Sequence, residues 1–172
     1  MVNTKNRREY FVALTSQDFG YAKRLAEEKY KFSRKEGHTD RMKGSVDHLI
    51  LTDARAIMAE RAVGRVMGWK WKRTINGAGQ PDFIVDGMKV DVKSTIREFP
   101  SLKIPCYNET DGIKNNKMDR FILVSVSPNN DYVVIRGWID KHEAIRRGTV
   151  GRRQSGFYWE VYHKYLEFME DW

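Results

Sequence analysis

The sequence predicts a single α/β domain in which a central mixed β-sheet is flanked by helices. Three observations predict this fold class. The first half of the chain contains two long segments in which apolar residues recur at helical spacing. From about residue 69 onward, short apolar runs alternate with turn signals, which is typical of strands. The 172 residues are enough to bury a core without disulfides or a structural metal.

Two helices are expected before the strands. The first covers residues 16–35, with Ser16 as its expected N-cap and Gly37 just after its end. The second covers about residues 46–67. Gly68 closes it, because glycine readily adopts the left-handed conformation that ends a helix.

Strands are expected in the second half of the chain, separated by turns. Asp86-Gly87 is a two-residue hairpin signal, Asn76-Gly77 is another, and residues 128–131 form a third turn. The segment 96–118 has no periodicity and contains two prolines, so we expect a long loop there. The expected strands are residues 69–75, 81–85, 88–95, 121–127 and 132–138.

The C-terminal part is expected to contain a short helix and a mixed tail. Asp140 is suited to cap a helix that runs through Arg147. Beyond it, residues 157–161 alternate like a strand, and residues 165–169 fit a closing helical turn. The single domain, residues 1–172, then divides into an N-terminal helical extension (1–45), a core (about 46–147) and an aromatic-rich tail (148–172).

The charge and the cysteine content indicate which kind of binding partner and which cellular compartment to expect. A net charge of +8 favours a polyanion, nucleic acid first and anionic membrane second. Cys106 is the single cysteine, so it excludes an intramolecular disulfide and a cysteine-based zinc site, and we expect a reducing, cytoplasmic location. The basic N-terminus lacks the apolar core of a signal peptide, and no run is long enough to span a membrane.

The hairpin around Asp86-Gly87 is expected to gather chemically active side chains. A two-residue turn there places Asp82 directly opposite Asp91. These two carboxylates share a face with Lys93, and Gln80 lies opposite Lys93. The other face is then apolar and contains Phe83, Val85, Met88, Val90 and Val92.

Two carboxylates on one face of a hairpin need a compensating charge. Their Cβ atoms would lie ~5 Å apart, where like charges repel. A divalent cation such as Mg²⁺ suits two converging carboxylates, and Lys93 adds a fixed positive charge, so the set fits phosphodiester hydrolysis. The alternative is a solvent-facing hairpin surface on which Lys93 only neutralises the two aspartates.

The second expected helix contributes a third carboxylate, Glu60, which falls within the apolar face of that helix. Arg61 and Arg65 fall on the opposite, charged side. A charge within an apolar face must be paired, protonated or bound to a metal, because a lone buried charge is costly. The alternative is a position at the rim, where Glu60 pairs with a nearby Arg or Lys. The apolar face contains Ala56, Ile57, Ala59, Ala62, Val63, Val66 and Met67.

These residues together resemble the PD-(D/E)xK superfamily of restriction-endonuclease-like nucleases. The matching segments are Ala-Glu-Arg-Ala-Val around Glu60, Gly-Gln-Pro-Asp ending at Asp82, and Asp-Val-Lys ending at Lys93. The resemblance covers about residues 46–138 and implies a restriction-endonuclease-like core of helix, β-meander, helix and further strand. One departure is that no well-formed helix is evident between the third and fourth expected strands.

The resemblance also implies a role for each residue. Asp82 and Asp91 would bind Mg²⁺ or Mn²⁺, Glu60 would be a direct or water-mediated ligand, and the carbonyl of Val92 a further one. Lys93 would orient the attacking water. The implied activity is metal-dependent hydrolysis of phosphodiester bonds, with DNA favoured over RNA, and pairing of two chains in a homodimer stays open.

Substrate contacts are expected from polar and basic residues near the carboxylates. A solvated charged surface explains each basic group equally well when it is taken singly. Two other functions stay open: a non-catalytic nucleic-acid-binding module with a nuclease-like fold, and an interaction protein of unrelated function. Clustered carboxylates favour the enzyme, because they would repel a phosphate that is merely bound. The expected contacts are Gln80, Lys72, Arg73, Lys114, Lys117, Arg152 and Arg153.

Overall fold

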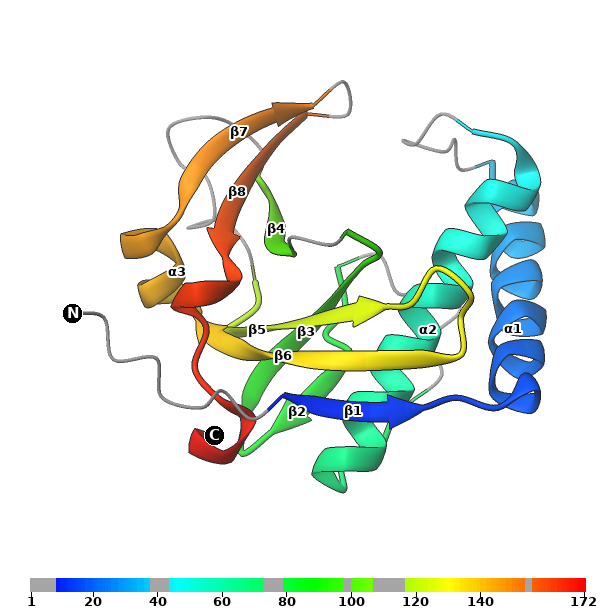
Figure 1. The fold of residues 1–172 in the computed structure, drawn as a ribbon. Helices are drawn as coiled ribbons and strands as arrows, with labels where there is room; N and C mark the ends of the chain where they lie inside the picture. Colours follow the sequence, from blue (N-terminus) through cyan, green and yellow to red (C-terminus); the bar gives the residue numbers. More distant parts are fainter. Residues whose placement is uncertain (1–8, 38–43, 73–78, 98–99, 107–116, 154–155) are drawn as a thin grey trace.

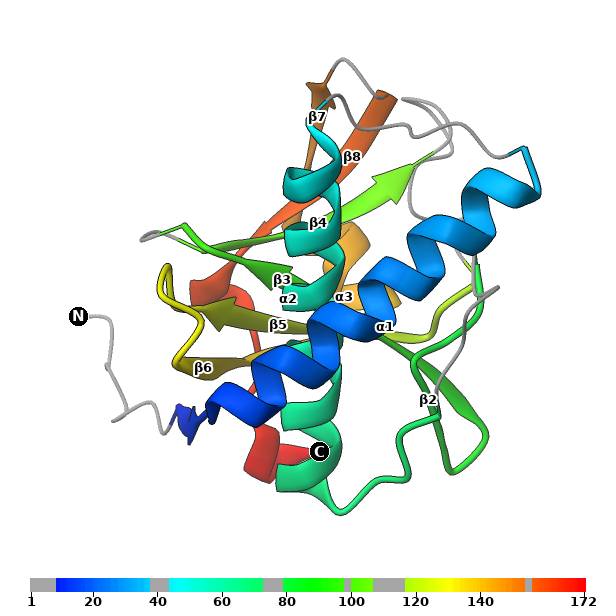
Figure 2. The same ribbon diagram turned by 90° about the vertical axis from the view of Figure 1, so that its right-hand side faces the viewer.

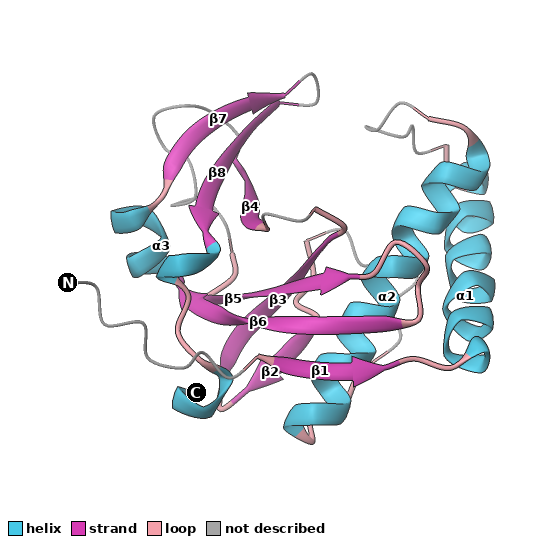
Figure 3. Ribbon diagram, in the orientation of Figure 1, coloured by secondary structure: helices cyan, strands magenta, loops and turns pink. Residues whose placement is uncertain are grey.

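The computed structural model describes residues 9–37, 44–72, 79–97, 100–106, 117–153 and 156–172. The fold is mixed α/β, with a five-stranded mixed sheet, long helices packed on one of its faces, and a second, three-stranded sheet (Figures 1 and 3). No helix in these described ranges is long and apolar enough to cross a membrane.

The main sheet has the strand order β1-β6-β5-β3-β2. The β2–β3 hairpin is antiparallel, β5 runs parallel to β3, and β6 and β1 continue the sheet antiparallel to their neighbours. The predicted strands from residue 81 to 138 are thus confirmed with small shifts of their ends, and β1 is an addition. The strands are β1 (Tyr10–Ala13), β2 (Phe83–Val85), β3 (Met88–Thr95), β5 (Arg120–Val126) and β6 (Tyr132–Asp140).

The second sheet is antiparallel, with the order β4-β8-β7, and it corrects two expectations. The prediction of a loop over residues 96–118 is wrong in part, because β4 (Ser101–Cys106) lies within it. Pro105 is accommodated because β4 is an edge strand, where a missing N–H costs little. The tail contributes β8 (Gly156–Tyr162), as predicted, and also β7 (Thr149–Arg153), which was not predicted.

The predicted helices are confirmed as α1 (Ser16–Lys35), α2 (Val46–Met67) and α3 (Lys141–Arg147). One cap differs: Thr15, not Ser16, caps α1, because Thr15 and Asp18 exchange hydrogen bonds in a capping box. Gly68 ends α2 with φ of 68°, as expected. Figure 2 shows α1 crossing α2 on its outer side. Short 3₁₀ turns, His163–Tyr165 and Met169–Asp171, close the chain.

The strand predicted at residues 69–75 is wrong in its described part, since Trp69 to Lys72 form no regular structure. The indole rings explain this, because tertiary packing takes precedence over strand propensity here. Trp69 lies 4.7 Å from Trp172 and 5.5 Å from Phe83, measured between ring centroids. The rest of that strand and the Asn76-Gly77 turn lie outside the described residues.

Two hydrophobic clusters lie on opposite faces of the main sheet. The first joins α1 and α2 to alternate residues of β3 and β5, including Val90, Val92 and Ile122. The second joins Phe121 and Leu123 of β5 to the second sheet and to α3. Strand β3 therefore has α2 on one side and faces the second sheet on the other.

Gly137 on β6 yields a stability prediction. Its φ is 137°, and a Cβ there would collide with the carbonyl oxygen of Glu167. We expect Gly137→Ala to lower the free energy of unfolding by more than ~2 kcal/mol. The control is Gly87→Ala, where φ is 81° and the surroundings are open, so the loss should be about 1 kcal/mol. Urea unfolding measures both, and equal losses would contradict the steric argument.

Candidate active site

The candidate site lies along the edge of β3 that β2 leaves uncovered. The hairpin has the predicted register, with Phe83 paired to Val90 and a turn in which Asp86 and Gly87 both have positive φ. Asp82 does not continue this ladder as a simple partner of Asp91, because its N–H donates to the carbonyl of Val90. Pairing with β2 therefore stops there, and the edge of β3 opens.

At this open edge, the side chain of Asp82 accepts the main-chain hydrogen bond that a neighbouring strand would otherwise accept. Its Oδ2 accepts a hydrogen bond of 2.6 Å from the main-chain N–H of Val92. The N–H and C=O of one strand residue point to the same side, so the carbonyl of Val92 also points toward this edge. Asp82 and the Val92 carbonyl are thus placed side by side.

Asp91 and Lys93 lie on the face of β3 turned toward the second sheet. Their neighbours in register on β5 are Phe121 and Leu123, which belong to that face's core. The Lys93 Nζ lies 2.9 Å from Oδ1 of Asp91 and 2.6 Å from Oδ2. The lysine therefore contacts both oxygens of the carboxylate.

Glu60 reaches the site from α2, where Ala59 and Ala62 are buried on either side of it in sequence. Its Oε2 accepts a hydrogen bond of 2.9 Å from Nε1 of Trp71. Burial raises the pKa of Glu60 and the charge of Asp91 adds to this, whereas the Trp71 bond opposes it. Among the described residues, Glu60 thus accepts its hydrogen bond from a neutral indole, while Lys29 and Lys93 act on it through their charges.

Asp82 has the more unusual acidity. Burial, first, and the charges of Glu60 and Asp91 raise the pKa of Asp82 to about 8. The Val92 N–H and Lys93 oppose this rise without cancelling it. Three carboxyl groups thus share a surrounding in which the charges of Lys93 and Lys29 only partly compensate their repulsion.

The donor set fits a hard divalent cation. Carboxylate and main-chain carbonyl oxygens are the ligands that Mg²⁺ and Mn²⁺ prefer, and the extra positive charge would offset the repulsion that raises the pKa of Asp82. Within the described ranges, no three His, Cys, Asp or Glu side chains already stand as a metal-binding group. Binding would require Asp91 to share its oxygens with the cation instead of giving both to Lys93.

The predicted substrate contacts are only partly gathered. Gln80 and Lys72 are exposed and stand next to the site in sequence, two residues before Asp82 and one after Trp71. Lys117 is exposed just before β5, whereas Arg152 is exposed on β7 in the second sheet. Of the other expected contacts, Arg73, Lys114 and the side chain of Arg153 lie outside the described residues.

Two residues at the site were not predicted from the sequence. Trp71 falls within the segment 69–75 that was expected to be a strand, and its indole N–H donates to Glu60. Lys29 of α1 lowers the pKa of Glu60 through its charge while its Nζ lies 3.4 Å from Asp53. No local pattern signals either contact, because each depends on how separate segments pack.

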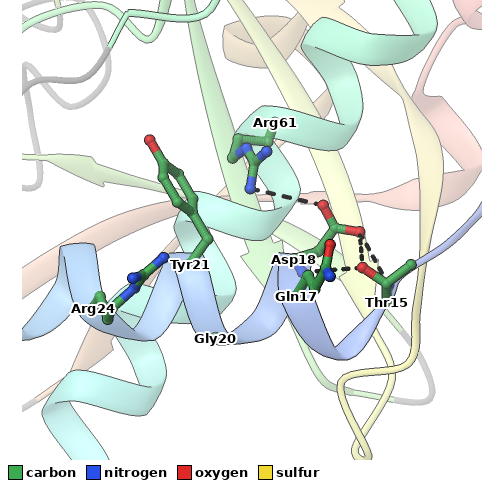
Figure 4. A pocket seen from close by; sticks show the side chains of 7 residues that line it. All are labelled: Thr15, Gln17, Asp18, Gly20, Tyr21, Arg24 and Arg61. Carbon is green, nitrogen blue, oxygen red and sulfur yellow. Dashed lines mark hydrogen bonds and ion pairs between the residues drawn. The ribbon is translucent and has the colours of Figure 1, made fainter.

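A hollow of about 540 Å³ lies elsewhere, between the start of α1 and α2 (Figure 4). Asp18 within it accepts hydrogen bonds from Thr15 and Arg65, and Arg61 packs over the ring of Tyr21. These contacts join the two helices. The hollow is lined by Thr15, Gln17, Asp18, Gly20, Tyr21, Arg24 and Arg61.

Comparisons with known proteins do not assign this site. Neither a scan against protein-family models nor a search of curated proteins finds a match for the chain. What the site can do must therefore follow from Glu60, Asp82, Asp91 and Lys93 themselves.

The raised pKa of Asp82 predicts how stability depends on pH. Between pH 3.8 and about 8, the folded protein keeps a proton on Asp82 that the unfolded chain releases. The stability of the metal-free protein should therefore fall as pH rises through this window. Asp82→Asn, which keeps an oxygen acceptor for Val92, should raise the melting temperature at pH 8 in a chelator but not near pH 4. A gain of equal size at both pH values would contradict the assignment.

The Trp71–Glu60 hydrogen bond yields a second prediction. Trp71→Phe keeps an aromatic ring but removes the donor, leaving a largely buried carboxyl group without it. We expect a loss of ~1–3 kcal/mol in the free energy of unfolding. In a Glu60→Ala background the same change should cost less, since no acceptor remains to be left unsatisfied. Urea unfolding of the four proteins in this cycle measures the coupling, and a coupling near zero would show that the bond contributes nothing.

Proposed function

We propose that this chain is a Mg²⁺- or Mn²⁺-dependent nuclease of the PD-(D/E)xK type that hydrolyses phosphodiester bonds, with DNA favoured over RNA. The observation that carries the proposal is a group of three acids at an open strand edge, in which Glu60, Asp82 and Asp91 affect one another's acidity, Lys93 contacts Asp91, and the pKa of Asp82 is raised to about 8. Such strongly shifted groups are more common at functional sites than on ordinary surfaces.

The order of the elements supports the same proposal. Helix α2 carries Glu60, the β2–β3 hairpin carries the other three residues, and β5 lies parallel to β3. The resemblance implies a helix, a β-meander, a second helix and a further strand, and the first helix, the hairpin and the further strand follow one another in that order here. The described connection from β3 to β5 contains β4 instead of a helix, so this chain would be a divergent example.

The oxygen ligands of the cation would be the carboxylates of Asp82, Asp91 and Glu60 and the carbonyl of Val92. A bound Mg²⁺ or Mn²⁺ would polarise the scissile phosphate and lower the pKa of a bound water. The hydrogen bond from Val92 holds Asp82 in place for this role, and Trp71 does the same for Glu60. These fixed positions reduce the reorganisation needed during the reaction.

Lys93 supplies the positive charge of the chain itself. Its Nζ lies beside Asp91, next to the edge where the phosphate would approach. If Asp91 shared an oxygen with a bound cation, Lys93 would have donors available for the attacking water and for a phosphate oxygen. A lysine in this position stabilises the extra negative charge that develops as the water attacks.

A comparison of two lysines on one face of β3 tests the proposal. We expect Lys93→Ala to lower single-turnover cleavage by ~10²–10³-fold, because it removes preorganised charge at the reacting phosphate. Asp91→Asn should lose cleavage similarly while still binding substrate. The control Lys89→Ala removes an equal charge from the same face, four residues away, and should leave cleavage nearly unchanged.

The measurement uses labelled duplex, single-stranded and branched DNA and RNA, each with a chelator, Mg²⁺ or Mn²⁺. Cleavage that requires the metal and Lys93 supports the nuclease. Binding without cleavage, together with an unchanged Lys93→Ala variant, would instead favour the nucleic-acid-binding module. A melting temperature that saturating Mn²⁺ leaves unchanged would rule out the metal site, because a ligand that binds the folded state raises that temperature.

A further inference from the structure

The second sheet has one face committed to the core and one face that carries polar and aromatic side chains. Alternate residues of β8 divide between them: Val161 is fully buried, and the Trp159 Nε1 donates to the carbonyl of Ala144 in α3. The opposite face of β8 carries Tyr158, Glu160 and Tyr162. We call this second surface the tyrosine face.

The tyrosine face presents an aromatic side chain to solvent. Tyr162 is 52% exposed, a large fraction for an aromatic residue within a strand. Tyr158 is half-buried and lies across the neighbouring strand β7, since a Cβ on Gly151 would collide with its ring. The Lys103 Nζ lies 4.5 Å from the centroid of that ring. One tyrosine is thus held in place by the sheet, and the other is exposed four residues further along β8, with Glu160 between them.

The carboxylate on this face does not give it a negative character. Glu160 accepts a hydrogen bond of 2.5 Å from the Ser101 hydroxyl, and Lys103 lies 3.3 Å away. Burial would raise the pKa of Glu160, but these two partners and the charge of Arg97 hold it below its usual range. The cations Arg97 and Lys103 outnumber the single acid, which suits a polyanion.

Arg97 also locates the tyrosine face relative to the candidate site. It lies two residues past the end of β3 and four residues after Lys93, and its N–H donates to the Thr95 hydroxyl. Strand β4 begins at Ser101, four residues after Arg97, and Ser101 pairs with Tyr162 in register, so only a short length of chain separates the end of β3 from the tyrosine face. The charge of Arg97 also acts on Glu160.

We infer that the tyrosine face binds an unpaired nucleic-acid strand, with bases stacked on Tyr162 and Tyr158 and a phosphate contacted by Arg97. This inference rests on the proposed function, because the nuclease site determines which polymer arrives. A duplex hides the flat sides of its bases within the stack, whereas an unpaired strand exposes them to aromatic side chains. The substrate class is therefore one with a single-stranded segment beside the scissile phosphate.

Tyr162→Ala tests the inference through binding measured in a chelator, where no cleavage occurs. Stacking on an aromatic residue contributes ~1–3 kcal/mol per base, so affinity for labelled single-stranded oligothymidine should fall about 5- to 150-fold. Affinity for a blunt duplex of equal length should not change. An oligonucleotide of the same length with abasic sites throughout should bind wild type and Tyr162→Ala equally well, because it has no bases to stack.

Two variants keep this test decisive. Tyr162→Phe retains the ring and should bind oligothymidine as wild type does, which separates lost stacking from a folding defect. Tyr132→Ala removes a 36% exposed tyrosine from the main sheet and should have no effect. Unchanged oligothymidine affinity in Tyr162→Ala, or an equal loss for duplex and abasic strands, would overturn the inference. Wild-type cleavage in Mn²⁺ tests the nuclease separately, so a cleaving enzyme with no role for Tyr162 refutes the tyrosine face alone.

Discussion

The hydrogen bond from the Val92 N–H to the Asp82 carboxylate is the contact on which the rest of the site depends. At the uncovered edge of β3 this main-chain donor would otherwise need water, since no described strand pairs with it there. By accepting it, the Asp82 carboxyl group is held beside Glu60 and Asp91, where burial and their charges disfavour its ionised form. Backbone geometry at the strand edge thus fixes an acidic side chain in a place where electrostatics disfavours its negative charge.

The approach of α2 adds to this concentration of charge. Gly64 lets the helix pack closely on the hairpin, because a Cβ there would lie 3.3 Å from the Phe83 ring and 3.1 Å from the Trp69 carbonyl oxygen. The same packing brings Glu60 toward β3 and Trp71 toward Glu60. Tight apolar packing and an unfavourable cluster of acids are therefore two results of one helix–sheet contact, and the hydrophobic core offsets the cost of the site.

The second sheet extends this arrangement beyond the carboxylates. Because β3 and β5 are parallel, the chain must cross the sheet between them, and part of that crossing is β4. Strand β4 buries Leu102 and Ile104 against the main sheet while Lys103, between them, points to the tyrosine face. The connection between β3 and β5 thereby contributes Lys103 to the tyrosine face, close in the chain to the end of β3, the strand proposed to carry Asp91 and Lys93.

The sequence alone determined the two long helices and the central hairpin. Helical periodicity predicted α1 and α2, Gly68 predicted the end of α2, and the Asp86-Gly87 turn signal predicted the Phe83–Val90 register, which placed Asp91 and Lys93 on one face. Only the tertiary structure decided that β4 and β7 pair with β8, that Asp82 bonds to Val92 and that Trp71 holds Glu60. Local spacing encodes backbone conformation and the facing of side chains, whereas short strands and buried polar contacts depend on partners that only the packed chain brings together.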